Sequence, residues 1–210
     1  MSEAYVSVQA GDVSLEALHE PGKSGAGAVL CHPHPLYGGD MGNNVVSALQ
    51  AALSGLGWGT LRFNFRGVGR SGGTYGEGVA EAADVAAAAA YLAGRGTQAV
   101  HLAGYSFGAW VVLKAIREGF RPESTTLVSP PLDLLDFSGL IPPPAPCLIV
   151  VGDRDDFCAA DSLKKWLASR PDSAEAPVVE ILARCDHFYR GKENLLREKV
   201  SGFVRTHLPG

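Results

Sequence analysis

Residues 99–118 read AVHLAGYSFGAWVVLKAIRE, with a strand pattern, a turn and a helix pattern in direct succession. The apolar run Ala99–Ala103 predicts a buried strand, and Phe107–Glu118 predicts a helix that stops at Gly119. Between them stands the pattern G-x-S-x-G, with Ser106 at its centre. A sharp turn from strand to helix lifts a serine hydroxyl above the sheet and points the helix N-terminus at developing negative charge. We therefore predict that Ser106 is a nucleophile.

The alternation of strand and helix patterns continues on both sides of this turn. An opening hairpin is predicted from the alternating segments Tyr5–Gln9 and Val13–His19. Further buried strands are predicted at Ala26–Cys31, Thr60–Phe65, Thr125–Val128, Cys147–Val151 and Val178–Leu182. Helices are predicted at Met41–Leu56, Val79–Ala93, Ala160–Ser169 and Lys192–His207. Such an order predicts an α/β fold, in which helices cover both faces of a mainly parallel sheet.

Length and composition narrow the class of protein. The 210 residues suffice for one core, so we expect a single domain over residues 1–210. The net charge of -4 and the lack of a basic run argue against nucleic acid or an anionic membrane as the main partner. The N-terminus shows no signal-peptide pattern, which favours a cytoplasmic location. The four cysteines are then expected to be free thiols, Cys158 and Cys185 included.

Other glycine motifs lack the context that their chemistry requires. Residues 22–24, Gly-Lys-Ser, resemble the end of a phosphate-binding loop, but Ala17 stands where that motif needs glycine. Residues 67–72 match a dinucleotide fingerprint, whose last glycine should already lie in a helix. Here Gly73, Gly76 and Gly78 follow within a few residues, so no helix can begin at that position. A second G-x-S-x-G pattern surrounds Ser71, which has neither a strand directly before it nor a helix directly after it. Ser106 is therefore the favoured nucleophile.

A serine nucleophile needs a base held by a third group. On a strand–turn–helix nucleophile the acid and then the histidine follow along the chain. Only His187 and His207 come after Ser106, and His207 lies at the C-terminal end of the last helix pattern. His187 follows the strand Val178–Leu182, at the sheet edge where catalytic groups gather. We predict that His187 is the base.

The acid is expected just after the strand Cys147–Val151. Three aspartates compete there, Asp153, Asp155 and Asp156. Asp153 also suits a turn beside a glycine, and Asp156 also suits the start of the next helix. The residue pattern alone leaves the choice open.

The segment Cys31–Gly39 follows another predicted strand and carries two interpretations. An oxyanion hole needs backbone N–H donors, one from Phe107 and one from this segment. Its prolines have no N–H, which leaves His34 or Leu36, and position favours His34. Alternatively, His32 and His34 could bind a metal ion together with a group from a later loop.

Five motifs together resemble the small, cap-free α/β-hydrolases related to dienelactone hydrolase. They are CHPHPLYGG (31–39), FNFRGVGRS (63–71), GYSFG (104–108), GDRDD (152–156) and DHF (186–188). The resemblance implies that the acid is Asp155, that the loop donor is His34, and that Arg66 and its loop shape the site wall. Dienelactone hydrolase itself has a cysteine where this chain has Ser106, which favours ordinary carboxylic esters over dienelactones. Only a short proline-rich connection, residues 129–146, stands where larger hydrolases insert a cap.

The expected function is thus a serine hydrolase with the triad Ser106, His187 and Asp155, acting on a small carboxylic ester or thioester without a cofactor. Four apolar residues in the surrounding loops are candidates for an acyl pocket, namely Leu36, Tyr37, Phe157 and Phe188. Two alternatives stand beside this hypothesis. One is a metal-dependent hydrolase that uses His32 and His34, and the other is a non-catalytic binding module on the same fold.

Overall fold

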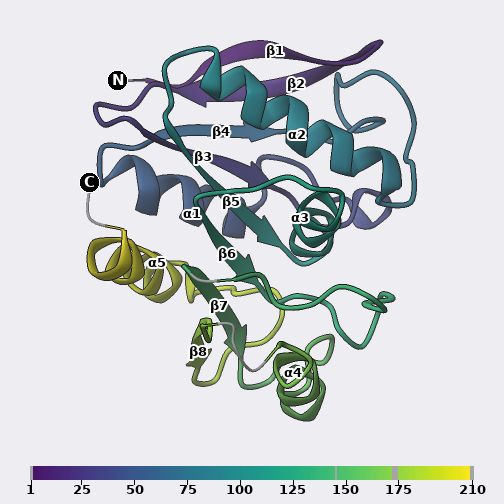
Figure 1. Ribbon diagram of the computed structural model, residues 1–210, viewed down its shortest axis with the longest axis vertical. Coiled ribbons are helices and arrows are strands. Elements are labelled where there is room, and N and C mark those ends of the chain that lie inside the picture. The colour runs from purple at the N-terminus through teal and green to yellow at the C-terminus, as the bar shows by residue number, and fades with distance from the viewer. Residues whose placement is uncertain (1, 145, 172–174, 209–210) are drawn as a thin grey trace.

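A computed structural model describes residues 2–144, 146–171 and 175–208. Its centre is an eight-stranded sheet in the order β1-β2-β4-β3-β5-β6-β7-β8 (Figure 1). The β1–β2 hairpin and the β2–β4 pair are antiparallel, and all other pairs are parallel. The strands are β1 (Ala4–Ala10), β2 (Val13–Glu20), β3 (Ala26–Cys31), β4 (Gly59–Phe63), β5 (Ala99–Tyr105), β6 (Ser124–Val128), β7 (Cys147–Gly152) and β8 (Val178–Leu182). The predicted α/β fold with a mainly parallel sheet is confirmed.

Helices cover both faces of the sheet, as predicted. On one face α2 (Val79–Ala93), α3 (Phe107–Arg117) and α4 (Ala160–Leu167) pack their apolar side chains into one buried core. On the other face α1 (Asn44–Ser54) and α5 (Glu193–His207) lie side by side over a second core (Figure 1). The connection from β6 to β7 contains no helix or strand in its described residues, 129–144 and 146. None of the described helices is long and apolar enough to cross a bilayer.

Several predicted element ends differ from the structure by one to three residues, and polar side chains lie at two of these ends. The helix predicted at Met41–Leu56 begins only at Asn44, because the Asn43 side chain accepts the N–H of Val45 at 2.9 Å and caps the first turn. The strand predicted at Thr60–Phe65 ends at Phe63. Beyond it, the side-chain oxygen of Asn64 accepts the N–H of Met41 at 2.8 Å. Both bonds are made by polar side chains, which apolar periodicity does not detect.

Two buried histidines join neighbouring strands through neutral rings. Within the sheet, His101 on β5 lies 2.7 Å from Ser124 Oγ and 3.0 Å from Thr126 Oγ1. His32, just after β3, lies 2.6 Å from the Pro33 carbonyl and accepts the N–H of Phe65 at 3.0 Å. Burial lowers the pKa of His32 to about 4 and that of His101 to about 3.

Both low pKa values predict a loss of stability in mild acid. The folded rings stay neutral down to about pH 4, whereas each ring takes up a proton near pH 6.5 in the unfolded chain. Because the unfolded state binds more protons in this window, the free energy of unfolding should fall as pH drops from 6.5 to 4. Urea unfolding of the wild type and of His101→Gln between pH 7 and pH 5 tests this. The variant lacks one of the two histidines, so its free energy of unfolding should fall less steeply with decreasing pH, by up to about 1.4 kcal/mol per pH unit. Equal slopes for the two proteins would contradict the assignment.

Candidate active site

Ser106 stands at the turn between β5 and α3 with a backbone that is unusual for a side-chain-bearing residue. Its φ is 53° and its ψ is -118°, a sparsely populated region that surrounding structure must enforce. The Ser106 N–H donates to the Val128 carbonyl at 2.9 Å. A Cβ on Gly104 would lie 2.4 Å from the Gly108 carbonyl oxygen, and a Cβ on Gly108 would lie 2.3 Å from that of Cys31. Both glycines of the pattern are therefore required for the turn to close.

The structure brings Ser106, His187 and Asp155 into one hydrogen-bonded chain. His187 Nε2 lies 2.9 Å from Ser106 Oγ. His187 Nδ1 lies 2.9 Å from Asp155 Oδ1 and 3.0 Å from Oδ2. With Nδ1–H donating to the carboxylate, Nε2 is free to accept the Ser106 hydroxyl proton. All three side chains are almost fully buried, so water competes little with these bonds.

Of the three competing aspartates, the structure places Asp155 against the histidine. Asp153 Oδ1 instead accepts the N–H of Cys185 at 3.1 Å and ties the acid loop to the base loop. Gly152 allows the same close approach, because a Cβ there would lie 2.2 Å from the Cys185 carbonyl oxygen. Asp156 is exposed to solvent.

Hydrogen bonds keep the Asp155 carboxylate ionised in spite of its burial. Burial by itself would raise the pKa of Asp155, but hydrogen bonds from His187 and from the Phe157 N–H outweigh it. The last of these bonds is 2.9 Å long. The pKa of Asp155 therefore lies below its ordinary value, and the group is an anion at neutral pH.

Two buried tyrosines support the loops, and the sequence analysis did not identify either. Tyr105 Oη donates to the His187 carbonyl at 2.8 Å. Tyr189 Oη donates to the Val150 carbonyl at 3.1 Å and lies 2.8 Å from Ser129 Oγ. A buried tyrosine needs a partner for its hydroxyl. The position of Tyr105 beside Ser106 was the one signal of such a role in the sequence.

The two backbone amides predicted for an oxyanion hole belong to neighbouring residues in space. The ring centroids of His34 and Phe107 lie 4.8 Å apart. Among the hydrogen bonds of the described residues, neither the His34 N–H nor the Phe107 N–H has an acceptor. The N–H of Leu36, the other loop candidate, donates to His34 Nδ1 at 3.2 Å and is therefore engaged.

The four apolar pocket candidates fall into two pairs. Phe157 and Phe188 flank the base, with ring centroids 4.7 Å and 5.7 Å from that of His187. Leu36 and Tyr37 belong to a short 3-10 helix, Pro35–Tyr37, and are 67% and 77% exposed. The second pair therefore lines an open surface instead of an enclosed pocket.

His32 does not have the geometry that the metal alternative requires. One of its ring nitrogens contacts the Pro33 carbonyl and the other accepts the Phe65 N–H, so both are engaged with backbone. Across residues 2–144, 146–171 and 175–208, no group of three His, Cys, Asp or Glu side chains is placed to hold a metal ion. The geometry does not support a metal-dependent hydrolase that uses His32 and His34.

The remaining sequence candidates have structural partners. Ser71 Oγ donates to the Asn64 carbonyl at 2.7 Å and accepts the Glu16 N–H at 2.9 Å, so the second G-x-S-x-G pattern stabilises a loop. Cys158 and Cys185 are buried free thiols. Burial raises the pKa of Cys185 to about 11 and that of Cys158 further, which keeps both protonated at neutral pH.

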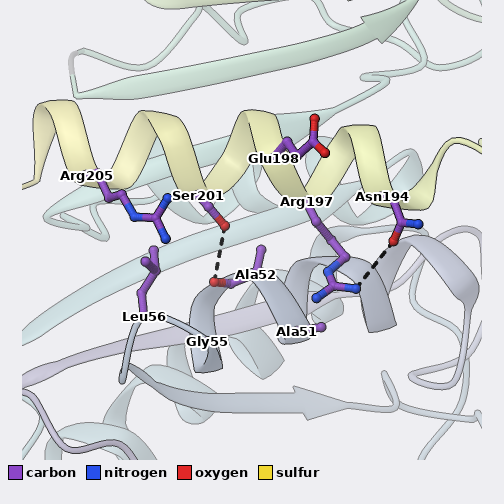
Figure 2. A pocket seen from close by; sticks show the side chains of 9 residues that line it. All are labelled: Ala51, Ala52, Gly55, Leu56, Asn194, Arg197, Glu198, Ser201 and Arg205. Atoms are coloured by element: carbon purple, nitrogen blue, oxygen red, sulfur yellow. Dashed lines mark hydrogen bonds between the residues drawn. The ribbon is translucent and has the colours of Figure 1, made fainter.

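A surface hollow of about 560 Å³ lies between α1 and α5 (Figure 2). Arg197 and Arg205 reach into it from α5, and Arg197 donates to Asn194 Oδ1 at 3.4 Å. Its serine, Ser201, donates to the Ala52 carbonyl at 3.5 Å, and no histidine is among the lining residues. This hollow therefore lacks the chemistry found at Ser106.

Comparison with known proteins finds relatives that this chain matches over most of its length. No family model matches it. An uncharacterised protein of Rickettsia prowazekii is 35% identical in an alignment of 189 residues that covers 85% of this chain and 78% of the relative. A crystal structure from Xanthomonas campestris, described as an α/β serine hydrolase without a lid, is 32% identical with a TM-score of 0.90 and covers 100% of this chain and 97% of its own. An α/β serine hydrolase homologue from Coxiella burnetii is 32% identical with a TM-score of 0.87, over 96% and 97% of the two chains.

Proposed function

Because the chain belongs to the lid-free α/β serine hydrolases, we propose that it hydrolyses small carboxylic esters or thioesters through an acyl-enzyme on Ser106. The observation that carries this proposal is the hydrogen-bonded chain from Asp155 through His187 to Ser106. Such a chain lets a weakly acidic hydroxyl lose its proton at the moment of attack. A non-catalytic binding module would not require the strained turn that presents Ser106.

The first half of the reaction transfers the acyl group to the enzyme. Ser106 Oγ attacks the carbonyl carbon while His187 Nε2 takes the hydroxyl proton, and the Asp155 carboxylate stabilises the imidazolium that forms. The carbonyl oxygen becomes an oxyanion, for which we propose the N–H groups of Phe107 and His34 as donors. When the tetrahedral intermediate collapses, His187 gives its proton to the departing alkoxide or thiolate, and Ser106 remains acylated.

The second half returns the enzyme to its starting state. Water attacks the acyl carbonyl while His187 Nε2 accepts a proton from it, and the same two amides hold the second oxyanion. Collapse releases the carboxylic acid and restores the Ser106 hydroxyl with the proton from His187. We assign Phe157 and Phe188, beside the base, and Leu36 and Tyr37, on the 3-10 helix, to the surface that the substrate contacts.

A fluorophosphonate probe tests the proposal directly, since it phosphonylates a serine only where a base activates it. We expect one probe per chain on the peptide that contains Ser106, loss of labelling in His187→Ala, and turnover of p-nitrophenyl acetate that a chelator does not inhibit. A folded protein that neither reacts with the probe nor turns over any ester would favour the binding module. Turnover that a chelator abolishes would favour a metal enzyme.

The open site predicts a preference for short acyl groups. No helix or strand of the described 129–144 segment forms a cap, so methylenes beyond the first few stay in water and do not gain the ~0.8 kcal/mol of burial each. We expect kcat/KM to fall from p-nitrophenyl acetate and butyrate to octanoate and decanoate, with no activation above the critical micelle concentration. A rise in kcat/KM up to decanoate would contradict this.

A further inference from the structure

We propose that Tyr75 is a positioning residue for the oxyanion hole and that it acts through the ring of His34. Tyr75 lies in the glycine-rich loop between β4 and α2, and the proposed reaction does not otherwise involve it. The inference rests on the proposed function, because it needs the His34 N–H to be an oxyanion donor.

The first support is the tautomer of His34, which its two hydrogen bonds determine. His34 Nδ1 accepts the N–H of Leu36 at 3.2 Å and therefore carries no hydrogen. Burial lowers the pKa of His34, which favours the neutral ring. The single ring hydrogen then lies on Nε2, which is 3.4 Å from Tyr75 Oη. Tyr75 accepts that hydrogen, so the ring is held at both nitrogens.

The second support is that the same rings join both proposed donors. The ring centroid of Tyr75 lies 5.4 Å from that of His34 and 5.9 Å from that of Phe107. With His34 and Phe107 4.8 Å apart, the three rings form one cluster. Since His34 and Phe107 carry the two free amides, a ring that contacts both constrains their relative position.

The backbone that follows Tyr75 is held by the buried side chain of Glu81, near the start of α2. Glu81 accepts the N–H of Gly76 at 2.8 Å and the N–H of Gly78 at 2.7 Å, and its side chain is fully buried. Gly78 also packs so closely that a Cβ there would lie 2.1 Å from the Trp110 ring. These contacts anchor the backbone at Gly76 and Gly78, directly after the residue whose ring contacts His34.

Misplacing an oxyanion donor costs transition-state stabilisation, because removing one donor lowers kcat by about 10²–10³. Tyr75→Ala leaves the amide in place but unsupported, so we expect kcat to fall by about 10- to 100-fold while KM changes little. Tyr75→Phe keeps the ring and loses one hydrogen bond, which corresponds to a drop in kcat of about 2- to 10-fold. Loss of a ground-state contact would raise KM instead.

The experiment compares the wild type, Tyr75→Phe and Tyr75→Ala, with Tyr5→Ala as control, because Tyr5 is a 65% exposed tyrosine on the hairpin strand β1. Fluorophosphonate titration counts the active sites, so rates refer to folded enzyme only. The readouts are kcat and KM on p-nitrophenyl acetate and the inhibition constant of a trifluoromethyl ketone, which forms a tetrahedral oxyanion on the serine. We expect the inhibition constant to rise by the same factor as kcat falls, and Tyr5→Ala to match the wild type.

If both Tyr75 variants keep kcat and the ketone's inhibition constant within twofold of the wild type, the inference is wrong while the proposed function stands. If KM rises and kcat does not change, Tyr75 contacts the substrate and does not position the amide. A wild type that is inert to the probe and to esters overturns the proposed function, and this inference with it. If Tyr75→Ala does not fold, the smaller drop in Tyr75→Phe remains the test.

Discussion

Replacing Ser106 with alanine is expected to lower ester turnover by a factor on the order of 10⁶. The substitution removes the Oγ that lies 2.9 Å from His187 Nε2 and leaves the base without a proton to accept. The turn should survive, because the Val128 carbonyl bond and the two flanking glycines involve only backbone. Single-turnover and steady-state rates with p-nitrophenyl acetate measure the loss, and unchanged near-UV circular dichroism shows that the fold is intact.

Ser71→Ala is the matched control, because Ser71 is the serine of the other G-x-S-x-G pattern. Its hydroxyl bonds to the Asn64 carbonyl and the Glu16 N–H, so the change should reduce the free energy of unfolding by roughly 1–3 kcal/mol. Turnover per active site should remain close to that of the wild type. Equal losses of turnover in the two folded variants would refute the assignment of Ser106.

Asp155→Asn is expected to lower kcat by a factor on the order of 10⁴ with little change in fold. An asparagine has no negative charge to stabilise the imidazolium, and its amide donates a hydrogen toward His187 Nδ1. The ring then carries its own hydrogen on Nε2 and cannot accept the Ser106 proton. Measuring kcat with the same short ester, after titration of active sites, checks this result.

The neighbouring aspartates provide the controls for this loop. In Asp153→Asn the side-chain oxygen can still accept the Cys185 N–H, so the base loop should keep its place. Asp156 is exposed, and Asp156→Asn should have a negligible effect. We expect each of these variants to keep kcat within about tenfold of the wild type. A larger loss in Asp153→Asn than in Asp155→Asn would mean that the acid has been misidentified.

Local patterns were sufficient to predict the elements and two of the three candidate catalytic residues. Buried parallel strands are mostly apolar on both faces, so the run Ala99–Ala103, apolar except for His101, was visible without any tertiary information. Ser106 could be separated from Ser71 because a nucleophile turn needs a strand and a helix on either side, and both are short-range features. His187 was found by a similar argument, since it follows a strand whose C-terminal end lies at the expected edge.

The acid could not be chosen from the residue pattern because Asp153, Asp155 and Asp156 have the same chemistry and lie within four residues. Their roles differ only in the direction of the side chains. That direction depends on Gly152 packing against the Cys185 carbonyl and on the Phe157 N–H, contacts with a loop some 30 residues away in the chain and with the turn itself. The family resemblance pointed to Asp155 on matching position, and the structure places Asp155 beside His187.

The sequence by itself therefore determined the α/β fold, the turn at Ser106 and the loop of the base, because each depends on side chains that are neighbours along the chain. Only the tertiary structure decided which aspartate meets His187, that the N–H of Leu36 is engaged while that of His34 is free, and that Tyr75 lies against His34. Tyr75 and His34 are 41 residues apart and meet because loops from two strand ends converge at one edge of the sheet. No periodicity records such a contact, since it depends on how loops fold back over a completed sheet and not on the burial of a regular face.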